Sequence, residues 1–428
     1  MNIFKNKLLW IAPIAIIVLL IILATAFYPA YNPSSKSLPI AIVNHDEGNN
    51  MQGQKVNVGK NLEDKLTDSD SDKIKWVSVD SEKEARKGLK EQKYFGVAVI
   101  EQDFSKNALS KTQKLVSDSK QAEIKEKADS GEIPPAQLQQ MKKQMANKSG
   151  STTDVKQANI KTIVNGGASM QAVQIANNVL SKVGENVNSQ ISQQSLEILN
   201  KQDVKVSAKD IKDVTNPVSI DKETINKVKS HQANGNGPFL MFMPVWMSAL
   251  VSSVLLFYAF RTSNNIKLSQ RLIASLAQMA VAVVTAFIGG FGYIYFMSEV
   301  QDFNFDDINK IAIYVSIAII AFIGLILGTM SWLGMKAIPI FFLLMFFSMQ
   351  LVTLPKQFLP QFYQDYIVSW NPFTHYANYL RELLYMNQSL EMNSTMWMFI
   401  GFMIFGIVSI LTATMIRKHS DKRTEVPS

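Results

Sequence analysis

Apolar residues are unevenly distributed, and they divide the chain into three parts. An apolar run near the N-terminus is followed by a long polar stretch, and apolar residues dominate again after Gly237. A membrane-spanning helix needs about 20 apolar residues. The pattern therefore predicts an N-terminal membrane anchor in residues 1–30, an inserted polar domain in residues 31–237, and a second membrane region in residues 238–428.

Six stretches are long and apolar enough to span a membrane. They are Leu8–Tyr28, Phe239–Phe260, Leu272–Met297, Ile311–Met330, Ala337–Leu354 and Met396–Ile416. The first is longer than the apolar core of a cleaved signal peptide, which usually has about 7–15 residues. An uncleaved anchor is therefore favoured, although the sequence Ala24-Thr25-Ala26 would suit cleavage.

Basic residues flank these predicted spans in a pattern that indicates their orientation. They lie before the first span, between the second and third, between the fourth and fifth, and after the last: Lys5, Lys7, Arg261, Lys267, Arg271, Lys336, Arg417, Lys418, Lys422 and Arg423. Cytoplasmic loops are enriched in Lys and Arg. The pattern predicts a multi-pass protein of the cell membrane, with both termini in the cytoplasm and the polar domain outside the cell.

Composition and charge exclude several classes of protein. The formal net charge is +8, but the basic residues of the polar domain alternate with acidic ones, so nucleic acid binding is not expected. There are no cysteines, which excludes disulfides and thiolate metal sites. The chain also lacks GxxxxGK[ST], HExxH and GxSxG motifs. We therefore expect neither an enzyme nor a bound cofactor.

The polar domain begins with an alternation of strands and helices. Leu38–Asn44, Lys73–Val79 and Tyr94–Ile100 are predicted strands, and Ser81 with Glu84 forms a capping box at the start of an intervening helix. This order predicts a small parallel sheet. VKVS and NPVSI, later in the domain, are candidates for further strands. The motif His45-Asp46-Glu47 could attract a cation, but a solvated turn is the favoured interpretation, and no metal site is predicted.

A second part of the polar domain has helical periodicity. Apolar residues recur at spacings of three and four between Ala168 and Leu199: Val173, Ala176, Leu180, Val183, Val187 and Ile191. Such spacing is typical of a coiled-coil seam. Two interpretations remain open. The seam could belong to a helical hairpin that packs on itself or on the sheet, or to a stalk that reaches a partner or pairs two copies.

The segment near residues 355–390 is too polar to span the membrane, yet it is rich in aromatic residues. Its last part, FTHYANYLRELLY, predicts an amphipathic helix whose apolar side turns away from His375, Asn378 and Arg381. Such a helix lies at the interface or re-enters the bilayer. It is either an anchoring helix or an outer gate over a path through the bundle. The candidate gate residues are Pro360, Asn371, Pro372, His375, Arg381 and Glu382.

Several motifs resemble those of the YhgE/Pip family, within the type-2 ABC exporter permeases. They are LPIAIVNHDEG, GQKVNVGKNL, WVSVDSEKEARKGLKEQKYFGVAVIEQDFS, LPKQFLPQF and NPFTHYANYLRELLY. The resemblance covers both ends of the chain. It implies a homodimer or heterodimer of membrane domains and a separate ATP-binding subunit. It also implies a cytoplasmic coupling element, in which Arg261, Lys267 and Arg271 would contact that subunit or anionic membrane lipid. Alternatively, these three residues only set the topology.

Three functional hypotheses follow. The first is an exporter permease that moves an amphipathic or lipid-like molecule outward with a separate ATPase. The second is a non-transporting surface receptor or assembly factor, suggested by the helical seam and by the lack of a charge cluster within the predicted spans. The resemblance extends to phage-infection proteins and to the type VII secretion accessory protein EsaA, which would fit such a role. The third, a membrane enzyme, has no paired carboxylates to support it, and would need a role for Glu382 or Asp365.

Overall fold

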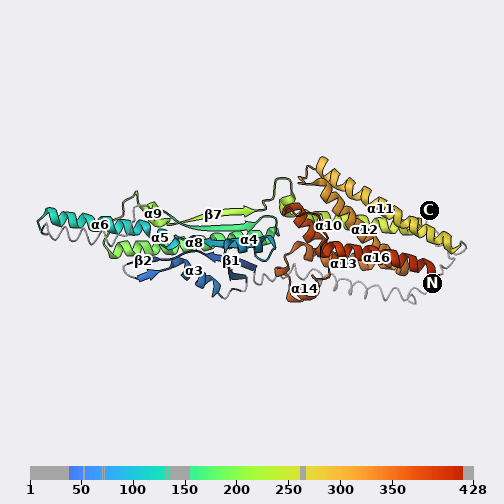
Figure 1. Ribbon diagram of the computed structural model, residues 1–428, viewed down its shortest axis with the longest axis horizontal. Helices are drawn as coiled ribbons and strands as arrows, with labels where there is room; N and C mark the ends of the chain where they lie inside the picture. The colour runs from blue at the N-terminus through green and yellow to red at the C-terminus, as the bar shows by residue number, and fades with distance from the viewer. Residues whose placement is uncertain are drawn as a thin grey trace, which may run out of the picture. The chain divides into compact units, whose positions relative to one another are not determined.

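The computed structural model describes residues 38–417, except 52–53, 70, 72, 132–133, 135–154 and 261–266. The described residues form two compact units: an α/β unit of residues 38–165 and 172–225, and a helical unit of residues 166–171 and 226–417 (Figure 1). Several sequence predictions lie outside the described residues. They concern the first span Leu8–Tyr28 and the basic residues Lys5, Lys7, Arg261, Lys418, Lys422 and Arg423.

The α/β unit is built on a five-stranded sheet in the order β4-β1-β5-β6-β7. Its strands are β1 (Leu38–Asn44), β4 (Ile74–Ser78), β5 (Gly96–Ile100), β6 (Ala158–Asn165) and β7 (Val218–Ile225). β1 is parallel to β4 and β5, as predicted, but β6 is antiparallel to β5. The prediction of a parallel sheet was therefore wrong for its second half. NPVSI leads into β7, whereas VKVS forms no strand.

Helices cover both faces of this sheet. Successive residues of the strands β1 and β5 are apolar and point to opposite faces, so both faces have side chains to bury. Ile42 and Ile100 pack with residues of α3 (Val58–Thr67) and α8 (Met170–Lys201) on one face. On the other face, Ala41, Val43, Val97 and Val99 pack with Ala85 and Leu89 of α4 (Glu82–Lys90). The predicted capping of α4 is confirmed on one side, since Ser81 Oγ accepts a hydrogen bond from Glu84 N.

The predicted seam lies on α8 and is buried within the α/β unit. Its buried positions are Ala172, Ala176, Leu180, Gly184, Val187, Ile191, Ser192, Ser195 and Leu199. Val187 and Ile191 pack against Ile42 and Ile100 of the sheet. The seam therefore packs on the chain's own sheet, which is the first of the two interpretations.

The other elements of the unit are shorter or more polar than α8. They are the hairpin β2 (Asn49–Met51) and β3 (Gln54–Val56), and the helices α5 (Phe104–Ala108), α6 (Ser110–Asp129) and α9 (Ile211–Thr215). Only Ser110 and Thr112 of α6 are buried. Strand β6 was not predicted. It follows a long segment rich in Lys, Gln and Ser, and this composition gives no sign that a strand begins there.

The helical unit has a long helix at the position of each of the five remaining predicted spans. Its long helices are α10 (Gly237–Ala259), α11 (Leu268–Glu299), α12 (Ile308–Leu333), α13 (Ala337–Thr353) and α16 (Ser394–Ile416). By length and composition, four apolar helical segments of the described chain could cross a membrane. One of them, Ile308–Thr353, comprises α12, a 3₁₀ turn at Gly334–Lys336, and α13.

Helix α12 lies at the centre of this unit. It contacts α10, α11, α13 and α16, as well as the short helix α15 (Pro372–Tyr385) (Figure 1). Gly324 of α12 and Gly406 of α16 allow close packing, because a Cβ on Gly406 would meet the backbone of Gly324. α11 leaves many apolar side chains exposed, including Ile273 and Ile288, as expected of a helix that faces lipid or another chain.

Candidate functional site

The connection between α13 and α16 folds into a helical element that packs among the long helices. It comprises a 3₁₀ turn (Lys356–Phe358), α14 (Gln361–Tyr366) and α15. Eleven of the 14 residues of α15 are buried, and α15 contacts α10, α12, α13 and α16. This burial is greater than the sequence predicted for an amphipathic helix.

The contacts of α15 with α10 show how far α15 extends into the bundle. Near the start of α15, the ring of Phe373 lies 4.5 Å from that of Trp246, measured between centroids. At its end, Tyr385 Oη accepts a hydrogen bond from Gly237 N, the first residue of α10. Trp246 is nine residues beyond Gly237, or about 14 Å along the helix. Since a hydrocarbon core is about 30 Å thick, α15 lies along roughly half of a span and does not lie across the end of the bundle.

Asn371 caps the buried N-terminus of α15. Its Oδ1 accepts hydrogen bonds from the backbone N–H groups of Phe373 and Thr374, at 3.0 and 3.1 Å. Its Nδ2 donates to Ser348 Oγ of α13, at 2.6 Å. Pro372 occupies the first turn, where its missing N–H costs nothing. Side chains of the chain itself therefore satisfy part of this helix end inside an apolar environment.

Polar contacts also hold the loop that leads into α15. Thr374 Oγ1 donates to the carbonyl of Val368, at 3.2 Å. His375 Nε2 lies 2.8 Å from the carbonyl oxygen of Ser369. Because a carbonyl oxygen only accepts, this contact requires a proton on Nε2. His375 is half-buried and thus fixes the loop rather than pointing freely outward.

Aromatic side chains surround α15 on the side of α10 and α12. Tyr314 of α12 stacks on Tyr376, with ring centroids 5.6 Å apart, and its hydroxyl donates to the carbonyl of Tyr376 at 2.8 Å. Phe322 contacts the rings of both Trp246 and Tyr376. Within the described part of the chain, Trp246 Nε1 and Tyr376 Oη have no hydrogen-bond partner. The aromatic rings therefore pack closely, while these two polar atoms form no hydrogen bond within the described residues.

Arg381 is buried, contrary to the expectation that it lies away from the apolar side. The residue is only 6% exposed, because α15 is enclosed by long helices and does not lie at a surface. Nη1 lies 3.5 Å from Asn378 Oδ1, and Nε has no partner among the described residues. Glu382, next in sequence, is half-buried.

The structure places five of the six candidate gate residues together on α15 and its cap. Asn371, Pro372, His375, Arg381 and Glu382 belong to this element, whereas Pro360 precedes α14. Sequence reasoning missed the side chains that other helices contribute, chiefly Trp246, Tyr314 and Ser348. A polar or amphipathic residue inside an apolar span was the available signal for Ser348 and Tyr314.

The candidate coupling residues lie at one end of the bundle. Lys267 is exposed at the start of α11, and Arg271 Nη2 donates to the carbonyl of Arg417 at 3.0 Å. Arg417 Nη1 donates in turn to the carbonyl of Ser331, at 2.5 Å. Lys336 follows Ser331 by only five residues. The basic residues that the structure describes near these helix ends are therefore grouped, and Arg261 lies outside the described residues.

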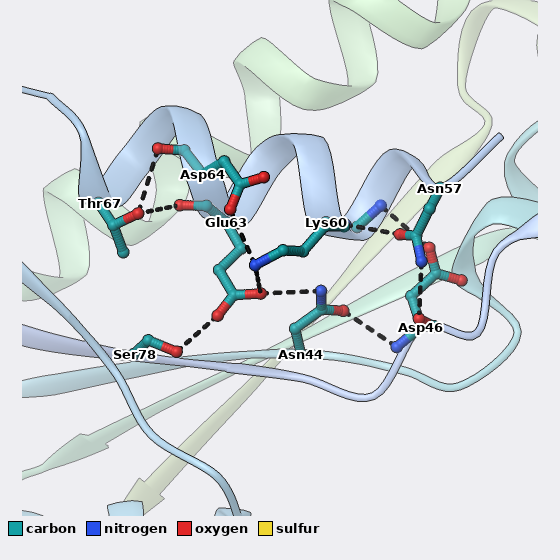
Figure 2. A network of polar contacts seen from close by, with 9 residues as sticks. Asn44, Asp46, Asn57, Lys60, Glu63, Asp64, Thr67 and Ser78 are labelled. Atoms are coloured by element: carbon teal, nitrogen blue, oxygen red, sulfur yellow. Dashed lines mark hydrogen bonds and ion pairs between the residues drawn. The ribbon is translucent and has the colours of Figure 1, made fainter.

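A polar network occupies the carboxyl end of β1 in the α/β unit (Figure 2). Asn44 Nδ2 donates to Glu63 Oε2 of α3 at 3.1 Å, and Ser78 Oγ donates to Glu63 Oε1 at 2.5 Å. Lys60 Nζ lies 2.9 Å from Asp64 Oδ1 and 3.5 Å from Glu63 Oε2. The groups pair with one another, so this network joins α3 to the sheet.

Asp46, from the predicted solvated turn, is buried instead. Its carboxylate accepts hydrogen bonds from Gly59 N at 3.0 Å and from Ser105 N at 2.9 Å, and also from Ser105 Oγ. These backbone groups belong to the first turns of α3 and α5, where a negative charge is favoured. His45 and Glu47 are exposed. In the described residues, no group of three or more metal-ligating side chains was found, and Asp46 acts as a structural link.

The apolar helices of the helical unit, of which four segments are long and apolar enough to cross a membrane, indicate a membrane protein that also carries an α/β unit. The sequence model of the ABC-2 family transporter proteins matches residues 7–413. The chain therefore belongs to this family of membrane transporter permeases.

A curated relative, the uncharacterized protein YhgE of Bacillus subtilis (strain 168), is 34% identical over 110 residues. The match covers 25% of this chain and 14% of that relative, so the chain spans only a small part of the relative's length. Together with the family match, it confirms the resemblance to YhgE-like permeases. No solved structure matches the chain.

Proposed function

We propose that the protein is the permease subunit of an exporter that moves an amphipathic or lipid-like molecule outward. A separate ATP-binding subunit would supply the energy, and two membrane domains would form the functional dimer. The observation that carries this proposal is α15, a buried helix that extends along about 14 Å of α10 and is capped inside the bundle by Asn371. Non-helical backbone at this depth is tolerated where it is buried in protein or lines a cavity.

The distribution of charge supports an orientation for the permease. Lys267, Arg271, Lys336 and Arg417 lie at one set of helix ends, and Glu299, Asp302, Asp306 and Asp307 lie at or near the ends of α11 and α12 on the other side. By the positive-inside rule, the basic ends would face the cytoplasm. In this orientation the α/β unit is extracellular and α15 enters the bundle from the outer side. Lys267 and Arg271 are then available to an ATP-binding subunit or to anionic lipid.

Cysteine labelling tests this orientation directly, because the chain has no cysteine of its own. Ser269→Cys and Gln301→Cys each add one thiol at exposed positions near opposite ends of α11. In intact cells, a membrane-impermeant maleimide should label the Gln301→Cys variant and leave the Ser269→Cys variant unlabelled until the cells are opened. The reverse pattern would contradict the proposed orientation.

Affinity purification in mild detergent from the host membrane tests the partner. We expect an ATP-binding chain to be recovered and identified by mass spectrometry, with ATP hydrolysis in the eluate. The double variant Lys267→Glu, Arg271→Glu should lose that chain, whereas Lys229→Glu, whose ion pair with Asp306 lies at the other end, should retain it. Recovery of no ATPase, together with flux that is insensitive to ATP depletion, would rule out the proposed function.

A further inference from the structure

Arg381 differs from the other basic residues of the helical unit in its burial. Among the described residues of this unit, Arg381 is the only charged residue that is buried. The other described Lys and Arg residues are half-buried or exposed. A buried charge is strongly disfavoured unless it is paired and hydrogen-bonded. The guanidinium group of Arg381 is therefore expected to have a partner that carries negative charge and accepts hydrogen bonds.

The described residues of the helical unit do not supply that partner. Across residues 226–417, apart from the gap at 261–266, Arg381 forms no ion pair, and its side-chain hydrogen bond goes to Asn378 Oδ1 at 3.5 Å. The neighbouring carboxylate of Glu382 is half-buried and interacts with Arg381 electrostatically, but not at ion-pair distance. The first 45 residues contain neither Asp nor Glu. The predicted first span therefore has no carboxylate that could pair with Arg381.

The buried side-chain atoms of the helical unit that lack a hydrogen-bond partner share one property. In the part of that unit which the structure describes, they are Trp246 Nε1, Tyr376 Oη and Arg381 Nε. All three can donate a hydrogen bond, and two of them can only donate. Trp246 packs against Phe373 at the opposite end of α15 from Arg381. The three atoms are therefore not treated as one site, and the inference rests on Arg381.

The position of Arg381 is also suitable for the headgroup of an amphipathic molecule. It lies one helical turn, about 6 Å, before Tyr385, whose hydroxyl donates to the carbonyl of Gln232 and accepts from Gly237 N at the start of α10. In the orientation proposed above, this is the outer end of the bundle. A guanidinium group binds phosphate and carboxylate through two parallel hydrogen bonds.

We propose that Arg381 binds the anionic headgroup, a phosphate or a carboxylate, of an amphipathic molecule at the outer end of the bundle. The inference rests on the proposed export function, since it names the headgroup chemistry of the transported molecule. The acceptor oxygens would pair with the guanidinium group. The charge of Arg381 is then retained because the bound molecule neutralises it.

Thermal unfolding of the purified full-length chain tests the site without requiring the ATP-binding subunit. The probes are phosphatidylglycerol as the anionic lipid, phosphatidylcholine as the neutral one, and inorganic phosphate as the headgroup without a tail. Phosphatidylglycerol should raise the Tm of the unmodified chain more than phosphatidylcholine does, because a ligand that binds the folded state stabilises it. Stabilisation by inorganic phosphate as well would support an anion site that also accepts free phosphate.

Two variants of Arg381 separate binding from folding. Arg381→Gln should weaken phosphatidylglycerol binding by about 10–100-fold, the loss expected for a hydrogen bond to a charged group, while Arg381→Lys should keep part of it. In phosphatidylcholine, Arg381→Gln should unfold at the same Tm as the unmodified chain or higher, because it removes an unpaired buried charge. Lys356→Gln is the matched control, since Lys356 is an exposed cation of the same connection, and it should bind phosphatidylglycerol unchanged.

The outcomes are distinct. Equal phosphatidylglycerol binding by Arg381→Gln and the unmodified chain would overturn the inference, as would a loss of binding in Lys356→Gln alone. If Arg381-dependent binding is found but no ATP-binding chain is recovered, the export function fails and the anion site stands. If the ATP-binding chain is recovered but Arg381→Gln binds phosphatidylglycerol normally, the anion site fails and the export function stands.

Discussion

The side-chain amide of Asn371 donates a hydrogen bond to the hydroxyl of Ser348, at 2.6 Å, and neither side chain is accessible to solvent. The same Asn371 accepts two backbone N–H groups from the first turn of α15. The side chain of Asn371 therefore both caps the N-terminus of α15 and links α15 to α13. In an apolar bundle this matters more than in water, because an unsatisfied N–H group has no solvent to bond with.

Replacing Asn371 should destabilise the bundle. Asn371→Ala removes the cap, worth about 1 kcal/mol, and leaves buried backbone N–H groups unpaired at a further cost of about 1–3 kcal/mol. Thermal unfolding of the purified chain would measure the loss. Asn393→Ala is the control, since Asn393 caps α16 through Met396 N but is only half-buried. A larger loss for the control would contradict our account of α15.

A double-mutant cycle isolates the contact between Asn371 and Ser348. If the hydrogen bond carries the coupling, the two single substitutions Asn371→Ala and Ser348→Ala should be less than additive, with an interaction energy of about 1 kcal/mol. The free energies of unfolding of the four proteins in the same detergent give this value. Additivity within error would mean that the two helices are held by packing alone.

The seam of α8 gives a prediction about the α/β unit. Leu180→Ala should cost about 2–5 kcal/mol, as expected for a buried leucine, because Leu180 is 2% exposed. Leu196→Ala, on the same helix but 42% exposed, should cost about 0.5 kcal/mol or less. Thermal unfolding measures both. Equal, small effects would mean that the seam is not packed on the sheet in solution and is free for another chain.

Asp46 should be essential to the fold of the α/β unit, whereas its neighbour Glu47 should not. Asp46→Ala removes hydrogen bonds to a buried carboxylate that each contribute about 1.5–3 kcal/mol, so a loss of at least about 3 kcal/mol is expected. Glu47→Ala removes an exposed carboxylate that pairs with Gln102 and should be close to neutral. Limited proteolysis of the full-length chain provides the measurement, with faster cleavage near residues 45–60 expected only for Asp46→Ala.

The sequence predicted the apolar helices well, because each span is long and uniformly apolar and needs no knowledge of its neighbours. The described helices α10, α11, α12, α13 and α16 agree with the predicted spans to within a few residues. Similarly, β1 and β5 are short, continuous apolar runs that are buried on both faces. Local composition was sufficient in these cases.

Arg381 and Asp46 could not be placed from sequence, because their burial depends on distant parts of the chain. Arg381 is buried by α15 packing among four long helices, whereas periodicity alone puts a charged residue at a surface. Asp46 is buried because Gly59 and Ser105 donate to it from two separate helices. The antiparallel pairing of β6 with β5 likewise could not be predicted, because the polar sequence before β6 gives no sign that a strand follows.

An ion-pair network on the α4 side of the sheet gives a prediction about pH. Arg86 Nη1 and Nη2 donate to both oxygens of Glu223, at 2.7 and 2.5 Å, and Arg86 Nε donates to Glu82 Oε1 at 2.7 Å. Lys161 Nζ lies 3.1 Å from Glu223 Oε2. These interactions, the hydrogen bonds from Arg86 above all, lower the pKa of Glu223 from 4.5 to about 2.

Because the folded-state pKa of Glu223 is lowered, its contribution to stability is present above pH 4.5 and is lost as the pH falls towards 2. Arg86→Gln should therefore lower the Tm at pH 7, and the difference from the unmodified chain should shrink steadily from about pH 5 downwards. Thermal unfolding over this range gives the profile. Lys87→Gln breaks a more exposed pair with Glu91 and should show a small difference at every pH, since exposed pairs contribute little. A difference for Arg86→Gln that stays constant down to pH 3 would show that Arg86 acts through packing rather than through the charge of Glu223.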